Sequence, residues 1–207
     1  ADVIGTLARE VKNLGCEVSL ALPFHRIIKD RYRDRVRHVV SFSVDIGWRP
    51  QYVGVELYDW DGIPVYFIDN EHYFGHAIYC GGNFEGEQYA FFSRALMEAL
   101  PIIGLEPEII HVNDWHTAII PMLMKIQYGL LPQGSAKTIL TIHNLGYQGR
   151  FHFGYAAHLL GIDDNDRVRR KAAFQQLAHR DRTAQSVAAH HDVIAQLFLQ
   201  AFHAEFL

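Results

Sequence analysis

The chain begins with hydrophobic residues at helical spacing, followed by a short continuous apolar run. The helical positions are Val3, Ile4, Leu7, Val11 and Leu14, and Gly15 ends the pattern. The run CEVSLALP at 16–23 ends at a proline and predicts a buried strand. Because helix, glycine and strand form the second half of a βαβ unit, we expect a first strand to precede Ala1.

Three segments rich in β-branched and aromatic residues come next, at 36–46, 51–58 and 63–68. The turn sequences GWRP and DWDG separate them, so we interpret the three segments as a strand-rich insertion. Residues 70–88 are polar, aromatic and glycine-rich. They predict a long loop, and loops of that length inside compact domains often carry function.

The following segments alternate between helix and strand patterns. Residues 88–104 predict a helix that Pro101 ends, with one apolar face made of Tyr89, Phe92, Leu96 and Leu100. Residues 107–114 predict a strand, 116–129 a helix and 137–144 a second strand. Short connections between them indicate a parallel sheet with a right-handed crossover. The predicted fold class is therefore α/β, with a Rossmann-like, doubly wound parallel sheet.

The composition changes after about residue 162. Residues 163–207 are rich in Ala, Gln, Arg and His and contain neither glycine nor proline. They predict a helical tail whose apolar face comprises Val193, Leu197, Phe198 and Phe202. We therefore divide the chain into one domain, 1–162, and a tail, 163–207, in which no residue indicates chemistry.

Polar side chains gather where the last two predicted strands of the domain end, in HVNDWH (111–116) and TIHNLGYQG (141–149). Ligands of open parallel sheets bind outside the carboxyl ends of the strands. If the two strands are neighbours, Asp114 or His116 and His143 project into one crevice. A carboxylate and imidazoles at such a place can take part in proton transfer or can hold sugar hydroxyls through charge-assisted hydrogen bonds. A flat apolar face and an amide, which suit carbohydrate, are added by Trp115, Tyr147 and Gln148.

Ordinary structural roles for the same residues remain open. Asp114 precedes a helix and is a favoured N-cap residue, which makes His116 a simple first-turn residue. His143 alone is equally well explained as a buried histidine of the core. Two polar strand ends in succession favour a site over these separate explanations.

Composition excludes several classes of function. The chain has 207 residues, of which 49% are hydrophobic and 20% charged, and a formal net charge of −4. This charge provides no basic field for nucleic acid, and no apolar stretch reaches the roughly 18 residues of a membrane span. Cys16 and Cys80 are too few for a disulfide scaffold and indicate a reducing compartment.

Short motifs narrow the chemistry further. Glycine-rich dinucleotide and P-loop fingerprints are missing from the sequence, as is a G-x-S-x-G elbow. His111 and His116 have no clear third ligand, so we predict no metal site.

The segments described above, in their order and spacing, resemble the N-terminal catalytic domain of bacterial glycogen synthases and plant starch synthases. These are retaining glucosyltransferases that use ADP-glucose. ADVIGTLAREVKNLGCEVSLALP resembles the stretch after the family's donor loop, and NEHYF and EQYAFFSRALMEAL resemble its middle. HVNDWHTAIIP and TIHNLGYQGRF are similar to its two most diagnostic segments. The resemblance runs from residue 1 to about 162.

The resemblance implies a two-domain GT-B architecture, of which this chain holds the N-terminal half. That domain contacts the glucan acceptor and part of the nucleotide sugar, and the C-terminal GT-B domain holds most of the nucleotide. The implied reaction adds an α-1,4-linked glucose from ADP-glucose to the non-reducing end of glycogen or starch. It requires neither a metal nor another cofactor.

Residue roles follow by position in the resembling motifs. Asp114 and His143 correspond to the catalytic residues nearest the transferred glucose. His143 is implied to bond a sugar hydroxyl or to support charge at the reacting centre, and Asp114 to order the acceptor side. Substrate-binding roles are implied for Asp2, Tyr79, His116, Asn144, Tyr147 and Gln148.

The chain also departs from the family pattern. Its sequence contains neither the first strand with the Lys-Thr-Gly-Gly-Leu donor loop nor the second domain, and residues 163–207 do not resemble the family. We therefore expect a fragment that is inactive on its own. A glucan-binding module without catalysis and a nonfunctional truncated gene product are the alternatives. The expected location is the bacterial cytoplasm, with the plastid as the alternative.

Overall fold

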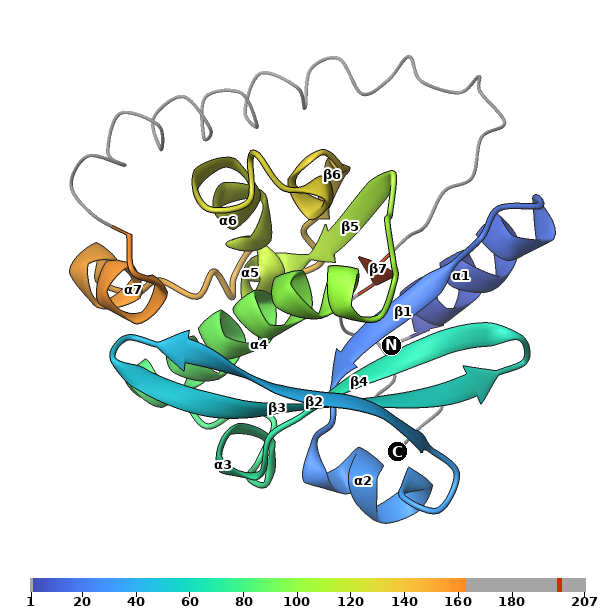
Figure 1. The fold of residues 1–207 in the computed structure, drawn as a ribbon, viewed down its shortest axis with the longest axis horizontal. Helices are drawn as coiled ribbons and strands as arrows, with labels where there is room; N and C mark the ends of the chain where they lie inside the picture. The colour runs from blue at the N-terminus through green and yellow to red at the C-terminus, as the bar shows by residue number, and fades with distance from the viewer. Residues whose placement is uncertain (1, 163–196, 199–207) are drawn as a thin grey trace.

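Two groups of strands form the framework of the computed structural model, which describes residues 2–162 and 197–198 (Figure 1). A five-stranded sheet has the order β2-β3-β4-β1-β7, and a two-stranded sheet pairs β5 with β6. The strands span Ser19–Pro23 (β1), Arg37–Ile46 (β2), Arg49–Trp60 (β3), Ile63–Asp69 (β4), Ile109–Asn113 (β5), Lys137–Thr141 (β6) and Leu197–Phe198 (β7).

Helices cover both faces of the larger sheet. They span Asp2–Asn13 (α1), Arg26–Tyr32 (α2), Glu71–Phe74 (α3), Gly82–Ile102 (α4), Asp114–Thr117 (α5), Ile120–Ile126 (α6) and Phe153–Leu160 (α7), with a 3-10 turn at Pro132–Gly134 (η1). Successive residues of β1 point to opposite faces, so Leu20 and Leu22 pack in the cluster that contains α1. Ala21 packs in the cluster that contains α4. Both faces of β1 are therefore covered, as is typical of an interior strand of an α/β sheet.

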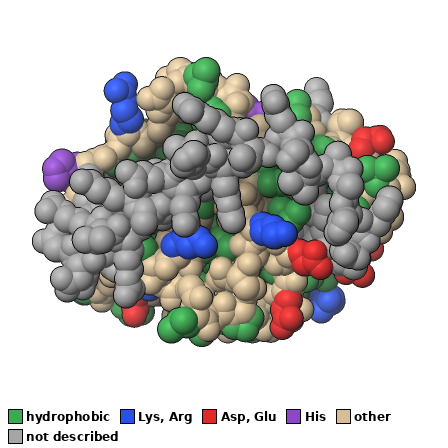
Figure 2. All heavy atoms as spheres, turned by 90° about the horizontal axis from the view of Figure 1, so that it is seen from above, with side chains coloured by type: hydrophobic (Ala, Val, Ile, Leu, Met, Phe, Trp, Pro, Cys, Tyr) green, Lys and Arg blue, Asp and Glu red, His purple; other side chains and the backbone are tan. Residues whose placement is uncertain are grey.

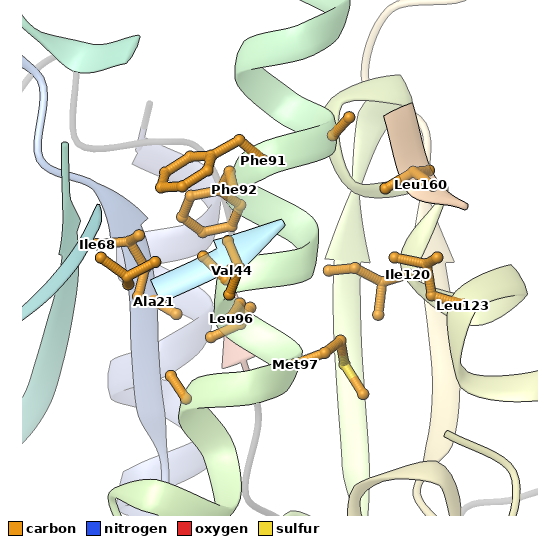
Figure 3. Close-up of a cluster of buried hydrophobic side chains, with 14 of the residues drawn as sticks. Ala21, Val44, Ile68, Phe91, Phe92, Leu96, Met97, Ile120, Leu123 and Leu160 are labelled. Atoms are coloured by element: carbon orange, nitrogen blue, oxygen red, sulfur yellow. The ribbon is translucent and has the colours of Figure 1, made fainter. Parts of the chain in front are cut away.

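The long helix α4 forms the centre of the main hydrophobic core. In Figure 3, Phe91 and Phe92 point toward Ala21 and Ile68 on one side, while Met97 points toward β5 and α6 on the other. The side chains of Phe91, Phe92 and Met97 are fully buried. Burial of side chains of this size contributes about 1.5–3 kcal/mol each. Helix α4 therefore ties the larger sheet to the β5–β6 unit that carries the polar strand ends.

The predicted parallel sheet is confirmed only in part, because the larger sheet is mixed. Strand β1 pairs in parallel with β4 and β7, and β5 pairs in parallel with β6. Strands β2, β3 and β4 pair antiparallel through two hairpins. Strand β4 was expected in an insertion, but it lies inside the sheet beside β1. Its Val65, Phe67 and Ile68 are buried against both layers, which explains its apolar run.

The prediction of one long loop over residues 70–88 is wrong. Helix α3 occupies its start, and α4 begins at Gly82 rather than at Gln88. The glycines at positions 81 and 82 are typical of a loop, so the sequence pattern did not predict a helix start here. Both glycines have positive φ, and the Glu85 carboxylate accepts a hydrogen bond from the backbone N–H of Gly81. This bond satisfies a group that a helix start leaves unpaired.

Two predicted elements between β5 and the loop after β6 are shorter than expected. The helix predicted at 116–129 is divided into α5 and α6, with Pro121 in the first turn of α6. The strand predicted at 137–144 ends at Thr141. His143 and Asn144 therefore belong to a loop beyond the sheet, where side chains are available to a ligand.

The helical prediction for the tail is wrong at Leu197 and Phe198. These residues form β7 and pair in parallel with Ser19 and Leu20 of β1. Strand β7 is the edge strand of the larger sheet and also lies against β5 (Figure 1). Extended pairing satisfies backbone groups along a buried strand, which outweighs the helical pattern at these two positions. The other tail residues, 163–196 and 199–207, lie outside the described part.

Candidate functional site

The two polar strand ends predicted from the sequence lie side by side. Strands β5 and β6 are parallel neighbours, and Asn113 and Thr141 are partners at their carboxyl ends. Two residues before Asn113 on β5, the ring Nε2 of His111 lies 2.7 Å from Thr141 Oγ1. Burial lowers the pKa of His111 to about 4, so this imidazole is neutral at physiological pH. The prediction that the two strands are neighbours is thus confirmed.

Asp114 connects the two strand ends through its carboxylate. Its Oδ1 accepts hydrogen bonds from the backbone N–H groups of His143 at 2.7 Å and Asn144 at 3.4 Å. Asp114 has φ 53°, a left-handed conformation in which Asp is enriched among non-glycine residues. The cap residue of α5 is Asn113, and its side chain makes no cap bond. The N-cap explanation for Asp114 is therefore wrong, because the carboxylate holds the loop after β6 instead.

His143 is exposed, which excludes its explanation as a buried core residue. Its Nε2 lies 2.9 Å from Asn113 Oδ1, and the Asn113 amide nitrogen is directed to the His111 carbonyl at 3.4 Å. Since Asn113 Oδ1 only accepts, Nε2 of His143 carries the hydrogen. In this tautomer Nδ1 can accept a hydrogen bond.

An aromatic cluster lies beside these residues. We define it as Tyr79, Tyr89, Trp115, His116 and Tyr147. The His116 ring stacks on Trp115 at 4.1 Å between centroids and meets Tyr89 edge-on at 4.4 Å. Tyr79 and Tyr147 form its outer part, with ring centroids 6.2 Å apart. Their side chains are 57% and 43% exposed, so aromatic surface faces solvent next to Asp114 and His143.

His116 lies beneath this surface rather than on it. It is 3% exposed, and neither ring nitrogen has a hydrogen-bond partner within the described residues. Burial lowers the pKa of His116 to about 4, although the nearby carboxylates of Asp114 and Glu85 oppose the shift. His116 is therefore a neutral ring packed among aromatic residues. Unpaired buried polar groups of this kind concentrate where structure serves function.

The remaining predicted residues have different positions. The Asn144 side chain accepts from the Gly146 N–H at 2.9 Å, and Gln148 Nε2 donates to the Leu145 carbonyl at 2.9 Å. Both side chains thus shape the loop locally. Asp2 begins α1, but its side chain lies outside the described part, and its assignment stays a prediction.

Two residues that contact the site were not predicted. Asn113 orients His143, and Glu85 accepts a hydrogen bond from the Tyr147 hydroxyl. Asn113 was detectable in principle, since it stands within the polar HVNDWH segment. Glu85 was not, because the sequence around it was interpreted as a loop and its partner is 62 positions away.

The described residues can also be examined for a metal site, a membrane-spanning helix and the distribution of surface charge. Among residues 2–162 and 197–198, no group of three or more His, Cys, Asp or Glu side chains is arranged to hold a metal ion. No helix in the same residues is long and apolar enough to cross a membrane. Where Figure 2 leaves the described residues uncovered, acidic, basic and hydrophobic side chains are interspersed.

Comparison with known proteins identifies the family. The family model described as "Starch synthase catalytic domain" matches residues 1–191. This chain belongs to the starch synthase catalytic domain family. The resemblance inferred from the sequence is thereby confirmed. The matched range includes residues 163–191, which were expected to form a separate tail that does not resemble the family.

Individual relatives agree with this assignment. The chain is 43% identical over 165 residues to a glycogen synthase of Caldicellulosiruptor bescii, covering 79% of this chain and 34% of the relative. It is 39% identical over 165 residues to a glycogen synthase of Clostridium acetobutylicum, covering 79% and 35%. The chain thus spans about a third of the length of the curated relatives it matches.

A solved structure of the family shares the fold. The catalytic domain of starch synthase IV from Arabidopsis thaliana, bound to ADP and acarbose, superimposes with a TM-score of 0.70 at 28% sequence identity. The match covers 80% of this chain and 34% of that chain. The mixed sheet and central α4 are therefore the architecture of part of a starch synthase catalytic domain.

Proposed function

We propose that this chain supplies the acceptor side of a retaining glucosyltransferase site, one that adds α-1,4-linked glucose from ADP-glucose to the non-reducing end of a glucan. Membership of the starch synthase catalytic domain family supports the reaction class. The ADP and acarbose bound to the Arabidopsis relative support a nucleotide donor and an oligosaccharide acceptor. The expected partners are therefore a glucan and a nucleotide sugar.

The observation that carries the proposal is the hydrogen-bonded connection between the ends of β5 and β6. Asp114 fixes the backbone at His143, and Asn113 fixes the orientation of the His143 ring. An imidazole held in this way loses little freedom when a sugar hydroxyl binds, which favours precise orientation of the substrate. His143 in our proposal bonds a hydroxyl of the transferred glucose, and Asp114 keeps it there.

The aromatic cluster supplies the apolar part of an acceptor site. A sugar ring presents C–H groups on its faces and hydroxyls at its edge, so it matches an aromatic surface bordered by polar groups. Tyr79 and Tyr147 offer such a surface, and the loop residues Asn144 and Gln148 offer amides near it. We assign the acceptor glucan to this surface.

The donor side requires groups beyond those described. Charge develops on the diphosphate leaving group, and cations stabilise it in a transferase site. Within the described residues, no Lys or Arg hydrogen-bonds to Asp114, His143, Tyr147 or Glu85. The relatives contain about twice as much additional chain, since this chain covers 34% of them. We propose that a C-terminal GT-B domain provides the cations, and that this chain alone binds glucan without transferring glucose.

Glycogen co-sedimentation combined with a transfer assay tests this proposal. The chain is incubated with glycogen and radiolabelled ADP-glucose, and both retained protein and incorporated glucose are measured. We expect retention without incorporation. Incorporation by the isolated chain contradicts the inactivity, and absence of retention contradicts the acceptor assignment.

The catalytic role of His143 is tested in a full-length relative that carries the same motif. Replacing the residue equivalent to His143 by alanine should lower turnover far more than glucan affinity, because the imidazole acts on the transferred glucose. Kinetics at varied glycogen concentration separate the two quantities. Equal loss of both assigns the residue to glucan binding instead.

A further inference from the structure

Glu85 is a buried carboxylate that joins two loops of the acceptor site. It lies near the start of the 21-residue helix α4 and is only 2% exposed. One oxygen accepts a hydrogen bond from the backbone N–H of Gly81 at 2.7 Å, and the other accepts one from the hydroxyl of Tyr147. Burying a carboxylate without such partners is costly, so both contacts are strongly favoured.

The two partners of Glu85 belong to the segments that carry the exposed tyrosines. Gly81 ends the segment that includes Tyr79, and Tyr147 stands in the loop that includes His143. The Tyr147 ring meets Tyr79 at 6.2 Å and Trp115 at 5.9 Å, edge to face in both cases. Glu85 therefore sets the distance between two loops whose rings form one surface.

The loop of residues 143–149 packs closely against Trp115 at Gly149. Gly149 has φ 54°, and a Cβ added there would lie 2.0 Å from the Trp115 ring. The loop thus rests directly on Trp115, with its backbone in a conformation that favours glycine. Trp115 contacts the loop at Gly149, and the bond from Tyr147 to Glu85 holds it at a second point.

We propose that Glu85 is a positioning residue for the α-glucan acceptor. By accepting the Tyr147 hydroxyl, it holds residues 143–149 against the aromatic cluster and fixes the spacing of Tyr79 and Tyr147. Without this bond the two rings move independently, and the surface that packs against a sugar ring is lost for part of the time. The assignment of the ligand as a glucan rests on the function proposed above.

A purely structural role for Glu85, as the cap of α4, is the alternative explanation. Tyr147→Phe distinguishes the two, because it removes the hydroxyl but leaves the ring and the bond between Glu85 and Gly81. Tyr155→Phe is a matched control. The Tyr155 hydroxyl donates to Glu87 at 3.0 Å, so the variant deletes a bond of the same kind two residues further along α4.

Hydrogen exchange and glucan affinity are measured on the full chain and on the variants Tyr147→Phe, Tyr155→Phe and Glu85→Gln. In Tyr147→Phe we expect faster amide exchange in residues 143–149 and roughly tenfold weaker binding of maltoheptaose, the upper range for one lost hydrogen bond. Tyr155→Phe should change neither. Glu85→Gln should retain most of the affinity, because its amide still bonds the Tyr147 hydroxyl.

Each result decides a separate part of the proposal. Unchanged exchange of residues 143–149 in Tyr147→Phe overturns the role of Glu85, whatever the affinities are. Faster exchange with unchanged affinity overturns its importance for the acceptor. A wild-type chain that binds no maltoheptaose overturns the proposed function and the acceptor assignment together, and the exchange data still show whether Glu85 holds the loop.

Discussion

Asp114 has the sequence position of a helix N-cap, but its carboxylate holds another loop instead. Its place before a helix is typical of an N-cap, yet its carboxylate accepts from the backbone of residues 143 and 144. The backbone of Asp114 is left-handed, with φ 53°. Such a conformation is not encoded in the residue type alone, so the sequence left both explanations open.

Two substitutions at Asp114 separate the backbone conformation from the hydrogen bonds. Asp114→Asn keeps an acceptor and tolerates positive φ, so the free energy of unfolding should fall by about 1 kcal/mol. Asp114→Ala loses the acceptor and is strained at this φ, so we expect a loss of about 2–4 kcal/mol. Urea unfolding measures both. Equal losses would show that the carboxylate contributes little to holding the loop.

His116 predicts a specific dependence of stability on pH. Its pKa is about 4 in the folded chain and ordinarily 6.5, so the unfolded state binds more protons between these values. The free energy of unfolding therefore falls as pH is lowered from about 6.5 toward 4. Between pH 7.5 and pH 5, His116 lowers the free energy of unfolding by about 2 kcal/mol.

His116→Phe tests this contribution, because phenylalanine fills the same space without titrating. Urea unfolding of wild type and variant at pH 7.5 and pH 5 gives the difference directly. The variant should lose about 2 kcal/mol less than wild type on acidification. An identical loss in both proteins would mean that His116 is not held neutral by burial.

At the scale of single elements, the loop after β6 is defined by its contact with Trp115. Gly149→Ala places a methyl group against the indole at a left-handed φ, and should lower the free energy of unfolding by about 1–3 kcal/mol. Gly146→Ala is the control, since the nearest atom to its added Cβ is the Asn144 side-chain oxygen at 3.2 Å. It should cost less than about 1 kcal/mol. Similar losses in both variants would show that the loop does not rest on Trp115.

The elements themselves were predictable to different degrees. Strands β2, β3 and β4 agree closely with the expected segments, because alternating β-branched residues and an Asp-Gly turn are local signals. Asp61 and Gly62 both have positive φ at that turn, as a two-residue hairpin requires. The start of α4 was not predicted, because the Glu85 carboxylate accepts a hydrogen bond from the backbone N–H of Gly81 there. Local composition indicated a loop.

For the whole molecule, the sequence predicted the α/β class and the neighbouring ends of β5 and β6, but not the pairing of the larger sheet. Alternation of helix and strand at residues 107–144 was enough to place β5 beside β6. The parallel pairing of β1 with β4 brings together Leu20 and Val65, which are 45 positions apart in the sequence. Such long-range register leaves no trace in local periodicity. The burial of His116 was hidden for the same reason.

The central claim for the molecule is that a glucan acceptor binds at the aromatic cluster beside Asp114 and His143. Titration of the isotope-labelled chain with maltoheptaose, followed by NMR of its aromatic side chains, tests this claim most directly. We predict saturable shifts confined to Tyr79, Trp115, Tyr147 and His143, and their loss in a Tyr79→Ala, Tyr147→Ala double variant. Saturable binding that leaves these signals unchanged, or that survives the double variant, would contradict the account.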